Sequence, residues 1–422
     1  MLYVYPLISW LYLATPPVAL GLAIATARRT RKVRPLRVLL RTFTTGGVLG
    51  SAVVTLYASV GRAHVPLSQV LLACYLGAAT LCIVFGLNWS IFQLTVRAFR
   101  LRSPVARAGG RRAAQAAAAL VQAVLLIGVG LPYLGSVLLL YRPDAPTPGT
   151  PATLVEADVY DVVHFRATDG TRLEGWWIPA THNAETDGRG SLKSGRDTVL
   201  FCPGFGADKA AQLFLARDLI ANGYNVLAID LRAHGKSGGQ FTALGGLESR
   251  DVLGAIRWLR QTHAQESQRI LGLGESLGAA ALIEAAADPG PEGQAIDAIA
   301  AYNPYADLRD EVNVLAAEHT IPAAHWALRH VILPVASAQI GCDLSRVSPR
   351  VAVRMLWPRP LLVIGNPTSS VVGGKGSYDL YQSALQPKYG YFPDDPDRDA
   401  LLHDHTAALT VRIFFDEERS VL

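Results

Sequence analysis

Apolar and polar residues are distributed differently on the two sides of residue 143. Residues 3–26, 43–61, 66–96 and 114–141 form four long apolar runs, of which the second, rich in Gly, Thr and Val, is the weakest. A helix that crosses a bilayer needs about 20 mostly apolar residues. Because the four runs follow one another without a single carboxylate, the pattern favours transmembrane helices over buried core helices. We therefore expect an all-α membrane region of about four spans in residues 1–141.

Beyond residue 155 the apolar runs are short and alternate with amphipathic segments. Residues 159–167 and 173–178 are expected to form a hairpin around Thr168-Asp169-Gly170. Further strands are expected at 198–202, 226–230, 269–272, 296–302, 360–365 and 388–392, and helices at 209–222, 247–261 and 277–287. Strands that alternate with helices predict an α/β fold, with a mostly parallel, doubly wound sheet.

A Pro-rich segment separates these two parts. Residues 142–153 carry four prolines and are expected to be extended and rather stiff, as at a domain boundary. The predicted organisation is a membrane region at 1–141, a linker at 142–154 and a folded domain at 155–422. Residues 182–196, rich in Gly, Ser and Asp, are expected to form a surface loop.

The net charge of +5 conceals the same division. The first 143 residues carry 15 Lys/Arg and no Asp or Glu, whereas the remainder carries 24 Lys/Arg against 34 Asp/Glu. Since the folded part shows no basic patch, a nucleic-acid partner is not indicated. A hydrophobic content of 50% excludes disorder, and four cysteines exclude a disulfide scaffold.

Basic residues between the apolar runs predict the topology. The first and third connections carry seven and six Lys/Arg, and the second connection and the segment after the fourth run carry one each. The positive-inside bias places the first and third connections in the cytoplasm. With four spans, the protein is a multi-pass membrane protein with both termini and the folded domain on the extracytoplasmic side; with three, the sidedness is not defined.

One short motif carries candidate chemistry. Gly274-Glu275-Ser276-Leu277-Gly278 fits the pattern G-x-S-x-G and lies between an expected strand and an expected helix. A sharp strand-to-helix turn exposes the serine hydroxyl at the edge of the sheet, and only small flanking residues fit there. This context favours a nucleophilic serine over a structural serine in a Gly-rich turn.

Residues 155–422 resemble the α/β-hydrolase fold, in particular serine hydrolases related to the serine aminopeptidases. The resemblance rests on the serine motif, on Glu248 and Asp251, and on three further segments. These segments are Asp169-Gly170-Thr171-Arg172-Leu173-Glu174-Gly175-Trp176, Pro203-Gly204-Phe205-Gly206 and Asp230-Leu231-Arg232-Ala233-His234-Gly235-Lys236-Ser237-Gly238-Gly239. In the last segment Ala233 stands where the family has Gly.

The resemblance implies a role for each matching residue. Ser276 would be the nucleophile, and the backbone N–H groups of Phe205 and Leu277 would form the oxyanion hole. His234 belongs to a segment that is structural in the family. By the same comparison, Asp230, Glu248 and Asp251 are expected to be structural.

The position of the triad acid departs from the family pattern. Ser369 occupies it, and a serine cannot supply the negative charge that stabilises an imidazolium, which in a related triad is worth about 10⁴ in kcat. The end of the preceding strand, an alternative position for the acid, carries Asn303. Asp307, Asp397 and Asp399 remain open as replacements.

The base is expected after the last strand. The family's Gly-Gly-His is absent, and an acidic insert at 394–399 precedes His403 and His405. His405 fits the family pattern better, and His403 remains the alternative. Because no third ligand has suitable spacing, a metal site at this pair is not favoured. Whether Cys202 pairs with Cys342 is left open.

Two functions are compatible with these residues. The first is a membrane-anchored serine hydrolase that cleaves an ester, thioester or amide through an acyl-serine intermediate, without metal or organic cofactor. Its substrate would be a small molecule or a lipid-derived acyl compound. The alternative is a catalytically degenerate domain that binds a ligand or partner, which the missing acid favours and the intact serine motif opposes.

Overall fold

The computed structural model describes residues 24–25, 116, 120, 131–140, 147–180, 197–312, 328–366, 374–393 and 402–420. The chain divides into two compact units, Met1–Leu131 and Pro132–Leu422, and the second is described below. The expected membrane spans lie outside the described residues except for 24–25, 116, 120 and 131–140. Within the described part, no helix has both the length and the apolar character needed to cross a membrane. The loop expected at 182–196 also lies outside it.

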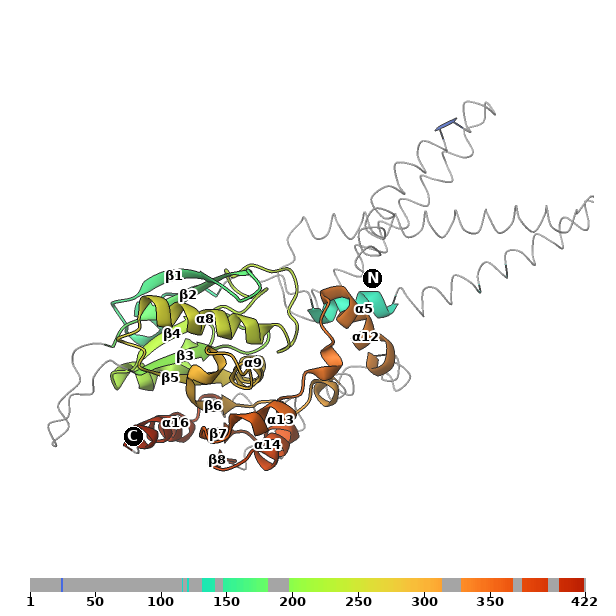
Figure 1. Ribbon diagram of the computed structural model, residues 1–422. Helices are drawn as coiled ribbons and strands as arrows, with labels where there is room; N and C mark the ends of the chain where they lie inside the picture. The colour runs from blue at the N-terminus through green and yellow to red at the C-terminus, as the bar shows by residue number, and fades with distance from the viewer. Residues whose placement is uncertain are drawn as a thin grey trace, which may run out of the picture. The chain divides into compact units, whose positions relative to one another are not determined.

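Eight strands form one sheet in the order β1-β2-β4-β3-β5-β6-β7-β8 (Figure 1). Strand β2 pairs antiparallel with both β1 and β4, and every other pairing is parallel. The strands are β1 (Asp161–Arg166), β2 (Arg172–Ile178), β3 (Asp197–Cys202), β4 (Asn225–Ile229), β5 (Arg269–Glu275), β6 (Ile296–Tyr302), β7 (Leu361–Ile364) and β8 (Lys388–Tyr391).

Helices cover both faces of this sheet, which explains why its central strands are continuously apolar. Along β3, Val199 and Phe201 belong to one buried cluster, whereas Leu200 and Cys202 belong to the other. The α-helices are α5 (Leu131–Leu140), α6 (Pro151–Val155), α7 (Arg217–Ala221), α8 (Glu248–Thr262), α9 (Leu277–Ala286), α12 (Leu333–Ile340), α13 (Pro349–Ala352), α14 (Gly374–Ser383) and α16 (His405–Ser420). Helices α8 and α9 pack in the cluster of Leu200 and Cys202, and α7 and α16 pack in the cluster of Val199 and Phe201.

The predicted strands and the mostly parallel sheet are confirmed, and two local predictions are wrong. The helix expected at 209–222 begins only with the 3₁₀ turn Leu213–Ala216. Before it, the Lys209 N–H is bonded to the Asp230 carboxylate and the Ala211 N–H to the Asp208 carboxylate. The segment expected to be extended contains α6, because Pro151 at its first position has a backbone angle suited to a helix.

Helix α5 is attached to the sheet-bearing unit. Leu140, at its end, is fully buried in the cluster of Leu200 and Cys202, and its carbonyl accepts the Thr242 N–H at 3.0 Å. After the undescribed residues 141–146, the Thr147 N–H donates to the Asp208 carboxylate at 2.6 Å. The residues on either side of 141–146 are therefore bound to the same folded unit.

Candidate active site

Ser276 lies in a strained turn between β5 and α9. Its backbone angles are φ 46° and ψ −107°, a region that non-glycine residues rarely occupy. The Ser276 N–H donates to the Tyr302 carbonyl of β6 at 2.8 Å, and this bond fixes the turn against the neighbouring strand. The serine side chain is thereby held at the carboxyl edge of the parallel sheet.

The flanking glycines allow this turn to be tight. A Cβ on Gly274 would lie 2.6 Å from the Ala279 nitrogen, and a Cβ on Gly278 would lie 2.1 Å from the Cys202 carbonyl oxygen. Any side chain at either position would separate α9 from β3 or distort the turn. The two glycines of G-x-S-x-G thus have a steric explanation in this chain.

The loop from Pro203 to Gly206 lies beside this turn and is held at two points. The Gly204 N–H donates to Gln212 Oε1 at 2.8 Å, and the Gly206 N–H donates to His234 Nε2 at 3.1 Å. Phe205, between them, contacts the His234 ring. Because Leu277 is the first residue of α9, its N–H has no partner within the helix. The two predicted oxyanion donors thus belong to the loop and the turn that flank Ser276.

Glu275 and Gln212 add a connection that the sequence did not indicate. Glu275 is 1% exposed, and its Oε2 accepts from Gln212 Nε2 at 3.4 Å. A Cβ on Gly204 would lie 1.6 Å from Glu275 Oε2, so the loop packs directly on this carboxylate. Gln212 therefore links the residue before the nucleophile to the predicted oxyanion loop. Sequence patterns could not reveal the contact between Gln212 and Glu275, because 63 residues separate them.

His234 has a structural role in this arrangement. Its Nδ1 lies 2.9 Å from the Arg232 carbonyl oxygen, which requires a proton on Nδ1. Its Nε2 then accepts from Gly206, so both ring nitrogens are engaged by backbone groups. The imidazole supports the loop and is not available as a general base, in agreement with the sequence-based interpretation.

The three matching carboxylates are also structural. Asp230 accepts the backbone N–H groups of Lys209 and Lys236, and burial raises its pKa although Lys209 opposes the shift. Glu248 accepts three hydrogen bonds from the loop that precedes α8, and Asp251 forms a buried ion pair with Arg232. These groups order the loops around the sheet edge.

The candidate bases lie at the start of α16. His405 is its first residue and is exposed. The exposed His403 stacks on Phe214 with ring centroids 4.7 Å apart. Between them, Asp404 accepts the Thr406 N–H and the Tyr391 hydroxyl, each at 2.8 Å. Among the described residues, neither imidazole is hydrogen-bonded to Ser276, so the structure does not bring this predicted pair together.

Of the positions considered for the triad acid, only Asp307 and Asn303 lie among the described residues. Ser369, Asp397 and Asp399 lie outside the described residues. The Asp307 carboxylate accepts the Arg309 N–H at 3.0 Å, which is a local turn contact. Asn303 follows β6 with φ 45° and is 2% exposed, and its Nδ2 has no hydrogen-bond partner among the described residues. Asn303 is therefore a buried polar group immediately after the residue that holds the Ser276 turn.

The two cysteines named above lie in the described part of the chain. Cys202 and Cys342 are both free, so they do not pair. Burial raises the pKa of the Cys202 thiol well above its ordinary value, which makes it unreactive. The described residues contain no cluster of three His, Cys, Asp or Glu side chains that could bind a metal.

Comparison with known proteins agrees with this geometry. The family model described as serine aminopeptidase, S33, matches residues 193–370, which include the loop, the turn and the position of Ser369. The esterase Pf2001 of Pyrococcus furiosus superposes with a TM-score of 0.52 at 21% identity, covering 66% of this chain and 97% of that one. The chain has the α/β-hydrolase fold. The expected fold class is thus confirmed for the part of the chain that contains the sheet.

Two relatives match part of the chain in sequence. The uncharacterized protein YfhR of Escherichia coli is 27% identical over 227 residues, which cover 54% of this chain and 69% of YfhR. The uncharacterized protein Rv2307c of Mycobacterium tuberculosis is 28% identical over 289 residues, which cover 67% of this chain and 88% of Rv2307c. The substrate of this α/β-hydrolase domain therefore has to be argued from its own residues.

Proposed function

We propose that the chain is a serine hydrolase, anchored in a membrane by its N-terminal region, that cleaves an ester, thioester or amide bond. The observation that carries the proposal is the strained Ser276 turn beside a loop held by Gln212 and His234. Strain of this kind persists only where the surrounding structure enforces it, and it is concentrated at functional sites.

In the proposed reaction the Ser276 hydroxyl attacks the substrate carbonyl and forms a tetrahedral intermediate. The Phe205 and Leu277 N–H groups donate to the oxyanion, and the partial positive charge at the start of α9 favours it. Collapse releases the alcohol, thiol or amine, and water then cleaves the acyl-serine. His405 would carry the proton from Ser276 to the leaving group, with His403 as the alternative.

Membrane anchorage supports a lipid-derived acyl substrate in this proposal. The four apolar runs and their uneven basic connections are the basis for placing the hydrolase domain on the extracytoplasmic side. The fold and the serine turn do not depend on this assignment, so the chemistry and the location are tested separately.

A fluorophosphonate probe tests the chemistry directly, because it phosphonylates an activated serine. We expect the membrane-embedded full-length protein to be labelled, and Ser276→Ala to abolish labelling. Ser383→Ala, at the end of α14, is the matched control because its hydroxyl serves only a local bond to the Asp379 carbonyl. Absence of labelling in the wild type, or persistence in Ser276→Ala, would refute the mechanism.

The second function, a catalytically degenerate binding module, is favoured by one observation. Among the described residues, no imidazole is hydrogen-bonded to Ser276, and Asn303 stands where an acid could have replaced Ser369. This candidate predicts an unlabelled protein that still unfolds cooperatively. The same probe therefore separates the two functions.

A further inference from the structure

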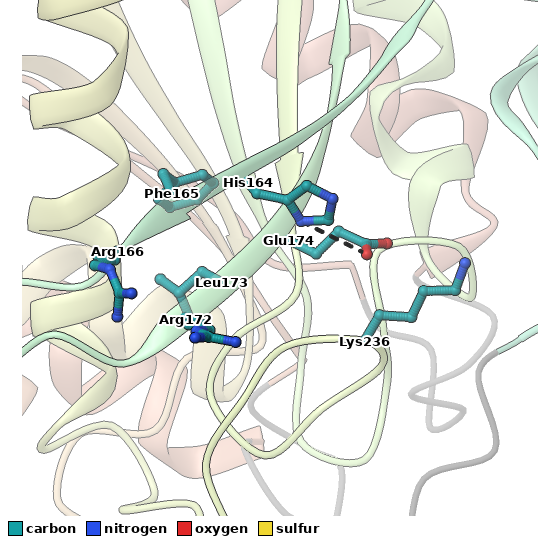
Figure 2. Close-up of a pocket in the computed structure, with 7 residues that line it drawn as sticks. All are labelled: His164, Phe165, Arg166, Arg172, Leu173, Glu174 and Lys236. Carbon is teal, nitrogen blue, oxygen red and sulfur yellow. Dashed lines mark ion pairs between the residues drawn. The ribbon is translucent and has the colours of Figure 1, made fainter.

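A pocket of about 400 Å³ lies on the β1–β2 hairpin, away from Ser276. It is bordered by β1, β2 and the loop that follows β4. Figure 2 shows Arg166 and Arg172 on one side, Lys236 on the other, and His164 and Glu174 between them. Three segments of the chain thus bring basic side chains to one cavity.

The charges of this pocket are unbalanced. Arg172 and Lys236 are exposed and have neither an ion pair nor a side-chain hydrogen bond among the described residues. Glu174 is the one carboxylate in the lining, and it is already paired with the buried Lys209 ammonium at 3.1 Å. Basic groups that face a common cavity without acidic partners favour an anion there.

Backbone contacts fix the two walls relative to each other. The Gly238 N–H donates to the Arg172 carbonyl at 2.7 Å. The Ser237 hydroxyl accepts the Glu174 N–H at 2.9 Å and donates to the Asp230 carbonyl at 2.6 Å. Lys236 is therefore on a loop that hydrogen bonds hold against β2. A ligand that binds between Lys236 and Arg172 would not lose free energy to ordering that loop.

We propose that this pocket binds a phosphate group, either of a small phosphomonoester or of a lipid headgroup. A phosphate offers more oxygens than a carboxylate, which suits cations that approach from several sides. The proposal goes beyond the hydrolase function and does not depend on acylation of Ser276.

The pocket lies on the same edge of the sheet as Ser276. Because β2 runs antiparallel to β4, its first residues lie at the same edge of the sheet as Ser276. Three strand spacings separate β2 from β5, or about 14 Å across the sheet. Glu174, in the pocket lining, is paired with Lys209, which follows the Phe205 loop in the sequence and also pairs with Asp230.

Calorimetric titration of the full-length protein in nonionic detergent, at low ionic strength, tests the site. The probes are inorganic phosphate, glycerol 3-phosphate and the soluble short-chain lipid dihexanoyl phosphatidic acid. We expect saturable binding of at least one probe, weakened at least about tenfold in the double variant Arg172→Gln, Lys236→Gln. Tighter binding of the short-chain lipid than of glycerol 3-phosphate would identify a headgroup, and equal binding a free phosphomonoester.

The matched control is Arg354→Gln, which removes an exposed arginine far along the chain and outside the pocket lining. Its affinity should stay within about twofold of the wild type. Thermal unfolding verifies that the double variant is folded, as expected for two exposed side chains. The proposal is overturned if no probe binds saturably, or if the folded double variant binds as tightly as the wild type.

Discussion

Ala233 occupies a backbone conformation that disfavours a side chain. Its φ is 56°, in the left-handed region, where a Cβ crowds the following carbonyl. The sequence showed that Ala233 replaces a family glycine but could not show the angle. The strain of this residue lies in the segment that also holds His234 and the Phe205 loop.

We expect Ala233→Gly to stabilise the protein by roughly 0.5–1 kcal/mol, since relief of the left-handed strain exceeds the added flexibility of the unfolded chain. Thermal unfolding in detergent measures the effect. Ala255→Gly, in the interior of α8, is the control of opposite sign and should destabilise by about 1 kcal/mol. A loss of stability in Ala233→Gly would show that the Ala233 methyl contributes more through packing than it costs in strain.

Gln212 is expected to position the oxyanion loop. Gln212→Ala removes the acceptor of the Gly204 N–H and the donor to Glu275. If the proposed function is correct, the second-order rate constant for fluorophosphonate labelling should fall by about tenfold or more, as for loss of an oriented oxyanion donor.

Ala211→Gly is the neighbouring control, because Ala211 is exposed and its contact to Asp208 uses only the backbone N–H. Labelling of this variant should be close to that of the wild type. An unchanged rate in Gln212→Ala would mean that the loop is held adequately by His234 alone.

At the scale of elements, the sequence predicted strands well because most are apolar runs buried on both faces. Residues 296–302 were expected as a strand, and β6 spans Ile296–Tyr302. Helical periodicity was less reliable at 209–222, where the Lys209 N–H is bonded to the Asp230 carboxylate, 21 residues away in the chain. Tertiary hydrogen bonds of this kind leave no periodic signature in the sequence.

The start of α16 depends on Asp404. Its carboxylate accepts the Thr406 N–H, as an N-terminal cap does, and also the Tyr391 hydroxyl. Burial alone would raise the pKa of Asp404, but these hydrogen bonds outweigh it and hold the pKa below its usual value. The stabilisation is therefore present above the ordinary pKa of an aspartate and is lost as the pH falls through the lowered value.

We expect Asp404→Ala to destabilise the protein by about 1 kcal/mol at neutral pH, the usual cost of losing a cap. Asp404→Asn should retain most of the capping and remove the titration. Unfolding curves between neutral pH and about pH 3 would then be flatter for Asp404→Asn than for the wild type. Equal pH dependence in the two proteins would assign the acid sensitivity to other carboxylates.

For the whole molecule, the order of the strands follows from the resemblance to a known fold rather than from any pattern of residues. The serine turn was predictable because its glycines encode local geometry. The pairing of base and acid was not, since it joins segments far apart in the chain, and several of the candidate acids lie outside the described residues. Sidedness remains a prediction from the basic connections.

An impermeant maleimide tests sidedness in intact cells. In a background in which all four cysteines are replaced by Ala, Leu385→Cys should be labelled, since Leu385 is 50% exposed on the hydrolase domain. Arg107→Cys, in the third connection, should react only after the membrane is opened. The reverse pattern would place the hydrolase domain in the cytoplasm.

The attachment of α5 to the hydrolase unit changes the role expected for the start of the Pro-rich segment. Leu140 and Thr147 both bind the hydrolase unit, so residues 141–146, at the start of the Pro-rich segment, join two points fixed on that unit. Adding flexible residues there should leave the hydrolase domain at the same distance from α5, because only loop closure changes, at about 0.6 kcal/mol for each doubling of length.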